Sequence, residues 1–572
     1  MILHALRLPV LITFAAALAL AGCGPKPEPA DLVLTNGKIV TLEQAKPEVQ
    51  ALAARGGVIA ALGTSKEMEA YIGPATQVID LDGRLATPGF IDSHLHFTGI
   101  GQAKLSLDLT KARSWEEIVA MVAEAVREAK PGQPITGRGW HQEKWDKRPE
   151  PNVDGLPLHD ALSKVSPDNP VVLTHASGHS CLANAKAMEL GKVTPATPDP
   201  AGGQVVKDAK GRPIGAFLET AQGLVRRSLA LWAASRTPEE KLEEQRRVVE
   251  LADRECLSKG LTSITDAGVG WSQVELYKSA IDQGRLGVRL NVMLSEGNKR
   301  LAEHAAEWRI LGYGGNRLTV RSIKRLIDGA LGAHGAWLLE PYSDLPSSTG
   351  LNTEPVEDLK ETARIAIENG YQLGVHAIGD RANRETLDIY EAAFKAHPDK
   401  KDVRFRIEHA QHLAAVDIAR FGALGVIAAM QAIHCTSDGP WIALRLGERR
   451  AEEGAYAWRK LMDTGAVVSN GTDAPVEDCD PIPGFYASVT RKMKNGQAFY
   501  PGQRMTREEA LRSYTLNGAY AAFEEGIKGS LAPGKLADVT VFSKDLMTCP
   551  EEDIRQAEVL WTIVGGRILY KK

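Results

Sequence analysis

Residues 88–96 read Pro-Gly-Phe-Ile-Asp-Ser-His-Leu-His. The apolar residues after Pro-Gly indicate a β-strand that ends at the histidines. Side chains alternate along a strand, so we expect His94 and His96 to point to the same face. Two imidazoles on one face suit a divalent transition metal. The pair alone is a weak signal, and its meaning depends on further ligands elsewhere in the chain.

Three more ligand-type residues follow short apolar runs. His376 lies in QLGVHAIGD, His409 in VRFRIEHAQ, and Asp473 follows AVVSNGT. His376 and His409 are 33 residues apart, about one strand–helix unit, and His409 and Asp473 are 64 apart, about two. In a barrel all strand carboxyl ends open on one face, so we expect the four histidines and Asp473 to converge there.

Helical and strand patterns alternate through the middle of the chain. Amphipathic stretches at 114–129, 239–260 and 357–370 carry apolar residues at helical spacing, and short apolar runs lie among them. This alternation predicts parallel strand–helix units, in either a (β/α)8 barrel or a doubly wound sheet. Residues 106–237 are rich in Pro and Gly and fit the repeat poorly. We expect them to form a large insertion that covers or shapes a site.

The two ends of the chain have a different pattern. DLVLTNGKIVTL, GGVIAALG and TQVIDLDGRLATPG near the start alternate β-branched residues with turn residues, and similar text returns only after residue 525. Neither end has enough strands for a stable sheet alone. We therefore predict one β-sandwich from 31–85 and 525–572, with a barrel over 86–524 between them.

The composition excludes several classes of protein. Of 572 residues, 44% are hydrophobic and 24% charged, which is typical of a globular chain and not of a disordered one. Lys and Arg total 68 against 72 Asp and Glu, and aromatic residues make up 6%. A near-neutral chain with few aromatics has no electrostatic footprint for nucleic acid.

The first residues predict an export signal. An apolar run from Leu8 to Leu20 follows Arg7 and is shorter than the roughly 20 residues that span a bilayer. It ends in Leu-Ala-Gly-Cys, which resembles the bacterial lipobox. The expectation is a signal peptide over 1–22, a lipidated Cys23 and a Pro-rich tether over 23–30, with the mature protein exported and anchored in the cell envelope by its lipid alone.

Five further cysteines remain, at positions 181, 256, 435, 479 and 549. Their number is odd and they form no Cys-x-x-Cys metal motif, so most are expected to be small buried apolar residues. One disulfide fits an exported protein, but the sequence does not choose its partners.

Several phrases together resemble the metal-dependent amidohydrolase superfamily, and within it the branch of YtcJ-like proteins and N-substituted formamide deformylase (amidohydrolase family 3). They are PGFIDSHLH, KRLIDGALG, VHAIGD, RIEHAQ and TDAPV, and the likeness extends to GHSCLANAKAMEL and the closing GSLAPGKLADVTVF. The resemblance spans nearly the whole mature chain. It implies an α/β fold: a (β/α)8 TIM-like barrel with a β-sandwich from both termini and an insertion after the first barrel strand.

The resemblance also implies roles. His94, His96 and Asp473 would hold one divalent metal, expected to be Zn2+, and His376 and His409 would hold a second ion if Lys324 is carboxylated and bridges the two. Without the carbamate the site would hold one ion. Asp473 would serve as the general acid and base. A possible substrate pocket includes His179, Asp328 and His334. Relatives often carry Ser-Arg where this chain has Ala333-His334, so no arginine contact to a substrate carboxylate is implied here.

The expected activity is hydrolysis of carbon–nitrogen bonds other than peptide bonds, in a small amide or N-substituted formamide. A bound metal would activate water and polarise the carbonyl. Alternatives are a cyclic amide, an N-acyl amino acid or an ester at the same site, or a non-catalytic envelope lipoprotein that binds or regulates. The oligomeric state stays open.

Overall fold

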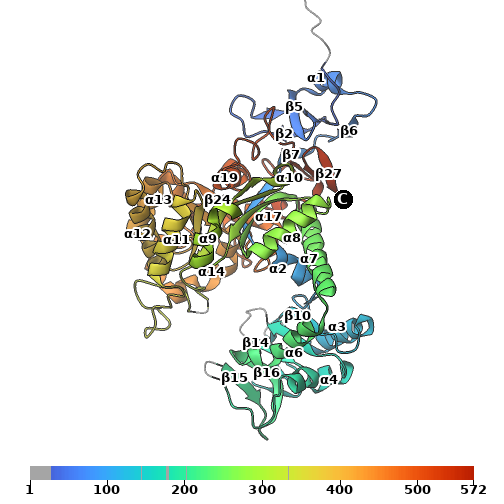
Figure 1. Ribbon diagram of the computed structural model, residues 1–572, viewed down its shortest axis with the longest axis vertical. Coiled ribbons are helices and arrows are strands. Elements are labelled where there is room, and N and C mark those ends of the chain that lie inside the picture. The colour runs from blue at the N-terminus through green and yellow to red at the C-terminus, as the bar shows by residue number, and fades with distance from the viewer. Residues whose placement is uncertain (1–26, 143–144, 176–179, 201–202, 333) are drawn as a thin grey trace, which may run out of the picture.

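The computed structural model describes residues 27–142, 145–175, 180–200, 203–332 and 334–572. The predicted signal segment, Cys23, His179 and Ala333 lie outside these residues. The described chain forms three parts that Figure 1 separates along its long axis. A barrel lies in the middle, a sheet domain containing both ends of the described chain lies above it, and the body formed by residues 107–235 lies below.

Eight parallel strands form the barrel, in the spatial order β24-β23-β22-β21-β20-β18-β17-β8. At the seam, the backbone N–H of Asp473 donates to the carbonyl of His94 over 2.7 Å, linking the segment after β24 to β8. The predicted (β/α)8 fold is confirmed, and the doubly wound alternative is not. The strands are β8 (Phe90–Leu95), β17 (Leu261–Val269), β18 (Arg289–Leu294), β20 (Leu318–Leu326), β21 (Gln372–Ala377), β22 (Arg406–His409), β23 (Ile427–Met430) and β24 (Val468–Asn470).

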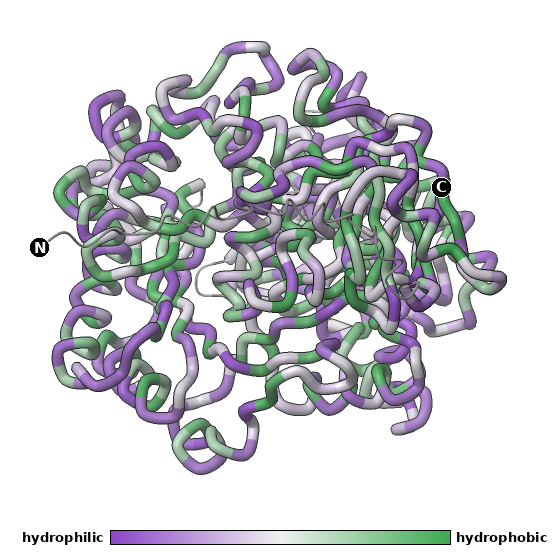
Figure 2. The backbone as a smooth tube through the Cα atoms, turned by 90° about the horizontal axis from the view of Figure 1, so that it is seen from above, coloured by the Kyte–Doolittle hydropathy of each residue, from purple (hydrophilic) through white to green (hydrophobic). Residues whose placement is uncertain are grey.

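Helices surround the strands because each connection between parallel strands must cross the sheet. The strands are buried on both faces, whereas the helices bury one face and expose the other. Figure 2 shows this as hydrophilic and hydrophobic stretches alternating along the peripheral helices. The helices of the barrel are α2 (Phe97–Lys104), α7 (Pro238–Ser258), α8 (Trp271–Asp282), α9 (Asn298–Trp308), α11 (Val356–Glu368), α12 (Asp380–Ala396), α13 (Ala415–Leu424), α14 (Ala432–Leu446), α15 (Glu448–Gly454), α16 (Trp458–Asp463), α17 (Pro481–Thr490), α18 (Arg507–Ser513) and α19 (Leu516–Ala521).

Strands from both ends of the chain share one sheet. Its order is β27-β26-β25-β7-β2-β3, with β7 antiparallel to β25, so that Ala86 pairs with Val541. A second sheet, β5-β4-β1-β6, comes from the first part of the chain alone and packs on the first through a shared core that includes Leu34, Val539 and Ile563. The strands are β1 (Leu32–Thr35), β2 (Lys38–Val40), β3 (Glu48–Val49), β4 (Ala51–Arg55), β5 (Val58–Gly63), β6 (Gln77–Asp80), β7 (Leu85–Pro88), β25 (Val539–Phe542), β26 (Val559–Val564) and β27 (Arg567–Lys571).

The insertion between α2 and α7 has a sheet and an apolar core of its own. It leaves the barrel after α2 and returns through α7, which runs along the side of the molecule in Figure 1. In the part of the chain that the structure describes, no helix is long and apolar enough to cross a membrane. The elements are β9 (Leu107–Asp108), β10 (Ile135–Trp140), β13 (Val171–His175), β14 (Ser180–Ala183), β15 (Gly203–Lys207), β16 (Pro213–Glu219), α3 (Trp115–Glu128), α4 (Asp160–Val165), α5 (Ala185–Leu190) and α6 (Gln222–Ser235).

Candidate metal centre

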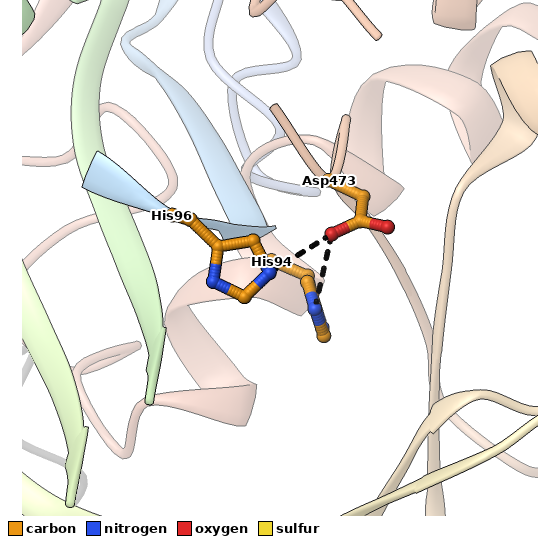
Figure 3. Close-up of side chains that lie close together, drawn as sticks. All are labelled: His94, His96 and Asp473. Carbon is orange, nitrogen blue, oxygen red and sulfur yellow. Dashed lines mark ion pairs between the residues drawn. The ribbon is translucent and has the colours of Figure 1, made fainter. Parts of the chain in front are cut away.

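The first pair of histidines meets Asp473 across the barrel seam. His94 lies near the end of β8, and His96 is the N-cap residue of α2. The carboxylate oxygen Oδ1 of Asp473 lies 3.5 Å from His94 Nε2 and 3.2 Å from His96 Nε2. Figure 3 shows both ion pairs as dashed lines. Residues that are 377 or more positions apart in sequence therefore place three ligand atoms together at the carboxyl end of the barrel.

The backbone around Asp473 is held by a buried carboxylate. Asp473 has a φ of 58°, in the left-handed region that residues with a Cβ seldom adopt. Asp92 accepts hydrogen bonds from the amide of His94 (3.0 Å) and from the hydroxyl of Thr472 (2.6 Å). Burial raises the pKa of Asp92 to about 7, against the lowering effect of these bonds. The network fixes an unfavourable backbone conformation at the residue that must meet both histidines.

A second group shares the same carboxylate. His409, His434 and Asp473 each offer a ligand atom, and these atoms lie within 4.8 Å of one another. His409 ends β22, and its Nδ1 lies 2.7 Å from the Gln431 side-chain oxygen. His434 comes from the first turn of α14 and is 8% exposed, and its Nε2 has no hydrogen-bond partner among the described residues. This nitrogen can bind a metal when the ring carries its proton on Nδ1.

His376 and Lys324 complete the cluster on the far side. The ring of His376 lies 4.4 Å from that of His409, centroid to centroid, and Lys324 Nζ lies 3.5 Å from His94 Nε2. Burial, with Lys324 nearby, lowers the pKa of His376 to about 3. Burial also lowers the pKa of Lys324 to about 8. At neutral pH the imidazole is therefore uncharged, which is the form that binds metals.

Asp473 itself is ionised. Burial opposes its charge, but the hydrogen bond with His96 and the nearby imidazoles of His94, His409 and His434 outweigh that effect and lower its pKa. Imidazole nitrogens around one ionised carboxylate form a suitable donor set for a divalent cation.

A buried ion pair orients His94. Its Nδ1 donates to Glu408, which also accepts from Arg406, and all three residues are fully or almost fully buried. Arg406 donates further to the carbonyl of Ser93 over 2.6 Å. An ionised carboxylate only accepts, so the proton of His94 sits on Nδ1 and its Nε2 lone pair faces the cluster. Such a partner fixes both the tautomer and the ring orientation of a metal ligand.

Sequence reasoning missed Glu408 and His434. Glu408 directly precedes His409 in the phrase RIEHAQ, and His434 follows the run GVIAAMQ by three residues. The signal for His434 was its position just beyond a predicted strand end, where ligands gather. Glu408 had no such signal, because its role depends on which side chains meet inside the barrel.

The residues assigned to a possible pocket have other contacts. Asp328 accepts backbone hydrogen bonds from Trp337, Ile378 and Gly379, at 2.9, 3.0 and 2.8 Å, and its Oδ1 lies 3.5 Å from His376 Nε2. It thus ties two loops together beside a histidine of the cluster. His334 pairs with Asp344 over 3.1 Å. His179 lies outside the described residues.

A (β/α)8 barrel whose strand ends gather buried imidazoles around one carboxylate defines a metal-dependent barrel hydrolase. The family described as "Amidohydrolase family" matches residues 77–570, and the chain belongs to it. This confirms the resemblance drawn from the sequence phrases and makes the protein a hydrolase that depends on a divalent metal.

Relatives cover almost the whole chain. Protein LONG AFTER FAR-RED 3 of Arabidopsis thaliana is 33% identical over 95% of this chain and 92% of its own length. The putative amidohydrolase YtcJ of Bacillus subtilis is 31% identical over 94% and 99%. N-substituted formamide deformylase of Arthrobacter pascens is 27% identical over 95% and 98%. The crystal structure of an uncharacterized metal-dependent hydrolase from Pyrococcus horikoshii superposes with a TM-score of 0.73, at 27% identity, over 91% of this chain and 99% of that one.

Proposed function

We propose that the protein hydrolyses the carbon–nitrogen bond of a small, non-peptide amide of the N-substituted formamide type. The observation that carries this is the position of Asp473 between two histidine groups, within 3.5 Å of His94 Nε2 and His96 Nε2 and beside His409 and His434. The similarity to N-substituted formamide deformylase over 95% of the chain supports the choice of bond.

Zn2+ suits the donor set, because imidazole nitrogen and carboxylate oxygen are its usual ligands after thiolate. His94, His96 and Asp473 would hold one ion. A second ion would be held by nitrogens of His376, His409 and His434. Lys324, if carboxylated, would be a ligand shared by the two ions. A divalent ion bound there supplies an activated water and an electrophile for the carbonyl oxygen.

The protein's own residues move the proton. Asp473 is ionised and lies beside the donors that would hold the ion, so it can accept a proton from the attacking water. It then delivers that proton to the nitrogen of the leaving amine, which departs as a neutral molecule. Glu408 keeps the His94 ring in place during these steps, because it accepts a hydrogen bond from Nδ1 and leaves Nε2 facing the cluster.

Asp473→Asn tests this proposal. We expect kcat on formamides to fall about 10²–10⁴-fold, the range for loss of a general acid–base group. Chelation should abolish the activity of the natural protein, and added Zn2+ should restore it. Asp463→Asn is the matched control, since Asp463 is exposed and pairs with Arg459 at 3.8 Å, away from the candidate metal centre. Full activity in Asp473→Asn, or in the chelated protein, would overturn the proposal.

A further inference from the structure

Two buried cysteines meet where α7 passes the segment after Asp473. Cys256 lies in the last turn of α7, and Cys479 lies just before α17. Their exposed fractions are 0% and 2%. The Cys479 side chain raises the pKa of the Cys256 thiol, although 222 residues separate the two in the sequence.

Neighbouring contacts hold the two segments together independently of the thiols. Lys259 Nζ lies 3.6 Å from a carboxylate oxygen of Asp478 and 3.8 Å from one of Asp480. The ligand atoms of Glu255, Asp478 and Cys479 lie within 4.8 Å of one another. Residues on both sides of Cys256 thus contact residues on both sides of Cys479, so the approach of the thiols follows from the packing of the backbone.

The other described thiols lie elsewhere. Cys181 belongs to a core cluster of the insertion, Cys435 lies in α14, and Cys549 contacts Arg507. A disulfide between Cys256 and Cys479 would therefore leave these three reduced.

We infer that Cys256 and Cys479 form a disulfide bond when the protein folds in the presence of a disulfide oxidant. The thiolate of Cys479 attacks one sulfur of the oxidant, forms a mixed disulfide and releases one thiolate. The thiolate of Cys256 then attacks the Cys479 sulfur, forms the bond within the protein and releases the second thiolate. The two protein thiols lose two electrons and two protons, and the oxidant ends as two thiols.

The positions suit this order of attack. Cys479 lies in the segment just before α17, outside any helix. Cys256 lies in the last turn of α7, where the Cys479 side chain and burial raise its pKa. The exchange therefore starts at Cys479 while the chain folds, before α7 covers it.

The disulfide would stabilise the position of the Asp473 segment in the candidate metal centre. Cys479 is six residues after Asp473. Helix α7 also packs closely on α2, whose N-cap residue is His96. A Cβ added at Gly101 of α2 would lie 2.0 Å from the Val248 carbonyl of α7. One covalent link to α7 would hold the Asp473 segment against the helix that supports His96.

Peptide mapping tests the inference without relying on any activity. The whole protein is refolded with oxidised glutathione, denatured, alkylated without reduction, digested and analysed by mass spectrometry. We expect one cross-linked peptide joining Cys256 to Cys479, with Cys181, Cys435 and Cys549 alkylated. Alkylation of both Cys256 and Cys479, or a link that joins either of them to another cysteine, would overturn the inference.

Matched variants give a second readout. Dithiothreitol should lower the melting temperature of the natural protein by a few degrees, and Cys435→Ala, which removes another buried thiol, should keep that response. Cys256→Ala should lose the response and the cross-linked peptide together. A response to dithiothreitol that persists in Cys256→Ala would also count against the bond. None of these results depends on the proposed amide hydrolysis, so the two proposals can fail separately.

Discussion

At the scale of single residues, the centre depends on buried carboxylates that lie behind its candidate ligands. Asp92 holds the backbone around Asp473, and Asp328 ties the loop after β20 to the loop after β21 beside His376. Glu408 sets the tautomer of His94. Ligand geometry in this barrel is thus imposed by buried carboxylates behind the ligands, each held by several donors.

Glu408→Gln should weaken metal binding. The amide removes the charged acceptor behind His94, and loss of such a partner typically costs about 10–100-fold in metal affinity. Titration of the metal-free protein with Zn2+ measures the effect. Glu525→Gln is the matched control, because Glu525 also pairs with an arginine, Arg404, at 2.8 Å. Unchanged Zn2+ affinity in a folded Glu408→Gln protein would contradict the assigned role.

Part of the centre could be predicted from residues alone. His94, His96 and Asp473 follow strand patterns, and strand ends of a parallel barrel share a face, so their meeting follows from spacing. His434 lies in the first turn of the helix after its strand. The position of a strand end does not fix the direction of a side chain on that helix. The pairing of Cys256 with Cys479 depends on how α7 packs against a loop, which no local pattern encodes.

At the scale of elements, one buried ion pair joins the barrel to the terminal sheet. Arg289, at the start of β18, donates to both oxygens of Asp538, just before β25, at 2.7 and 2.9 Å. Both side chains are about 5% exposed. Burial disfavours the charge on Asp538, but Arg289 outweighs it and holds the pKa of that carboxyl below 3.8.

Asp538→Asn should therefore destabilise the protein. Breaking one side of a buried pair leaves a charge without its partner, which costs about 3–5 kcal/mol. Urea unfolding at pH 7 measures the loss. Glu361→Gln, which breaks an exposed pair with Arg364, should cost less than about 1 kcal/mol. Equal decreases in the free energy of unfolding in the two variants would show that burial does not make the Arg289–Asp538 pair more costly to break.

The same pair sets a pH dependence. Above the ordinary pKa of 3.8 the carboxyl is ionised in both the folded and the unfolded protein, and the pair contributes fully. As the pH falls through the lower folded pKa, protonation of Asp538 removes that contribution. The free energy of unfolding should thus drop on acidification, and by less in Asp538→Asn. An identical drop in both proteins would exclude Asp538 as a cause.

Elements with a strong repeat were predictable, and those without one were not. The barrel could be predicted from the alternation of strand and helix patterns, because each unit buries an apolar strand beneath an amphipathic helix. The insertion has no such period. Its sheet mixes parallel and antiparallel neighbours, in the order β15-β16-β14-β13-β10-β9, and this order depends on contacts within that body.

At the scale of the whole molecule, we propose that the protein works in the cell envelope, tethered by a lipid on Cys23. The basis is the apolar run that ends in Leu-Ala-Gly-Cys. Cys23→Ser should abolish lipid labelling and release the protein from the membrane fraction or leave it unprocessed. Cys181→Ser is the control and should behave as the natural protein. Unchanged processing and membrane partitioning of Cys23→Ser would contradict the proposal.

The sheet shared by both ends of the chain has a consequence for the order of events during synthesis. Strand β7 cannot pair with β25 until β25 has been synthesised. Lys38 likewise has its partner, Asp545, 507 residues later in the chain. A ribosome must finish almost the entire polypeptide before this sheet can close. Until then the first strands present an unpaired edge, the kind of surface that invites aggregation or a chaperone. The last strands to be made therefore close the fold, and a nascent chain that stops short of them leaves the earliest strands without partners.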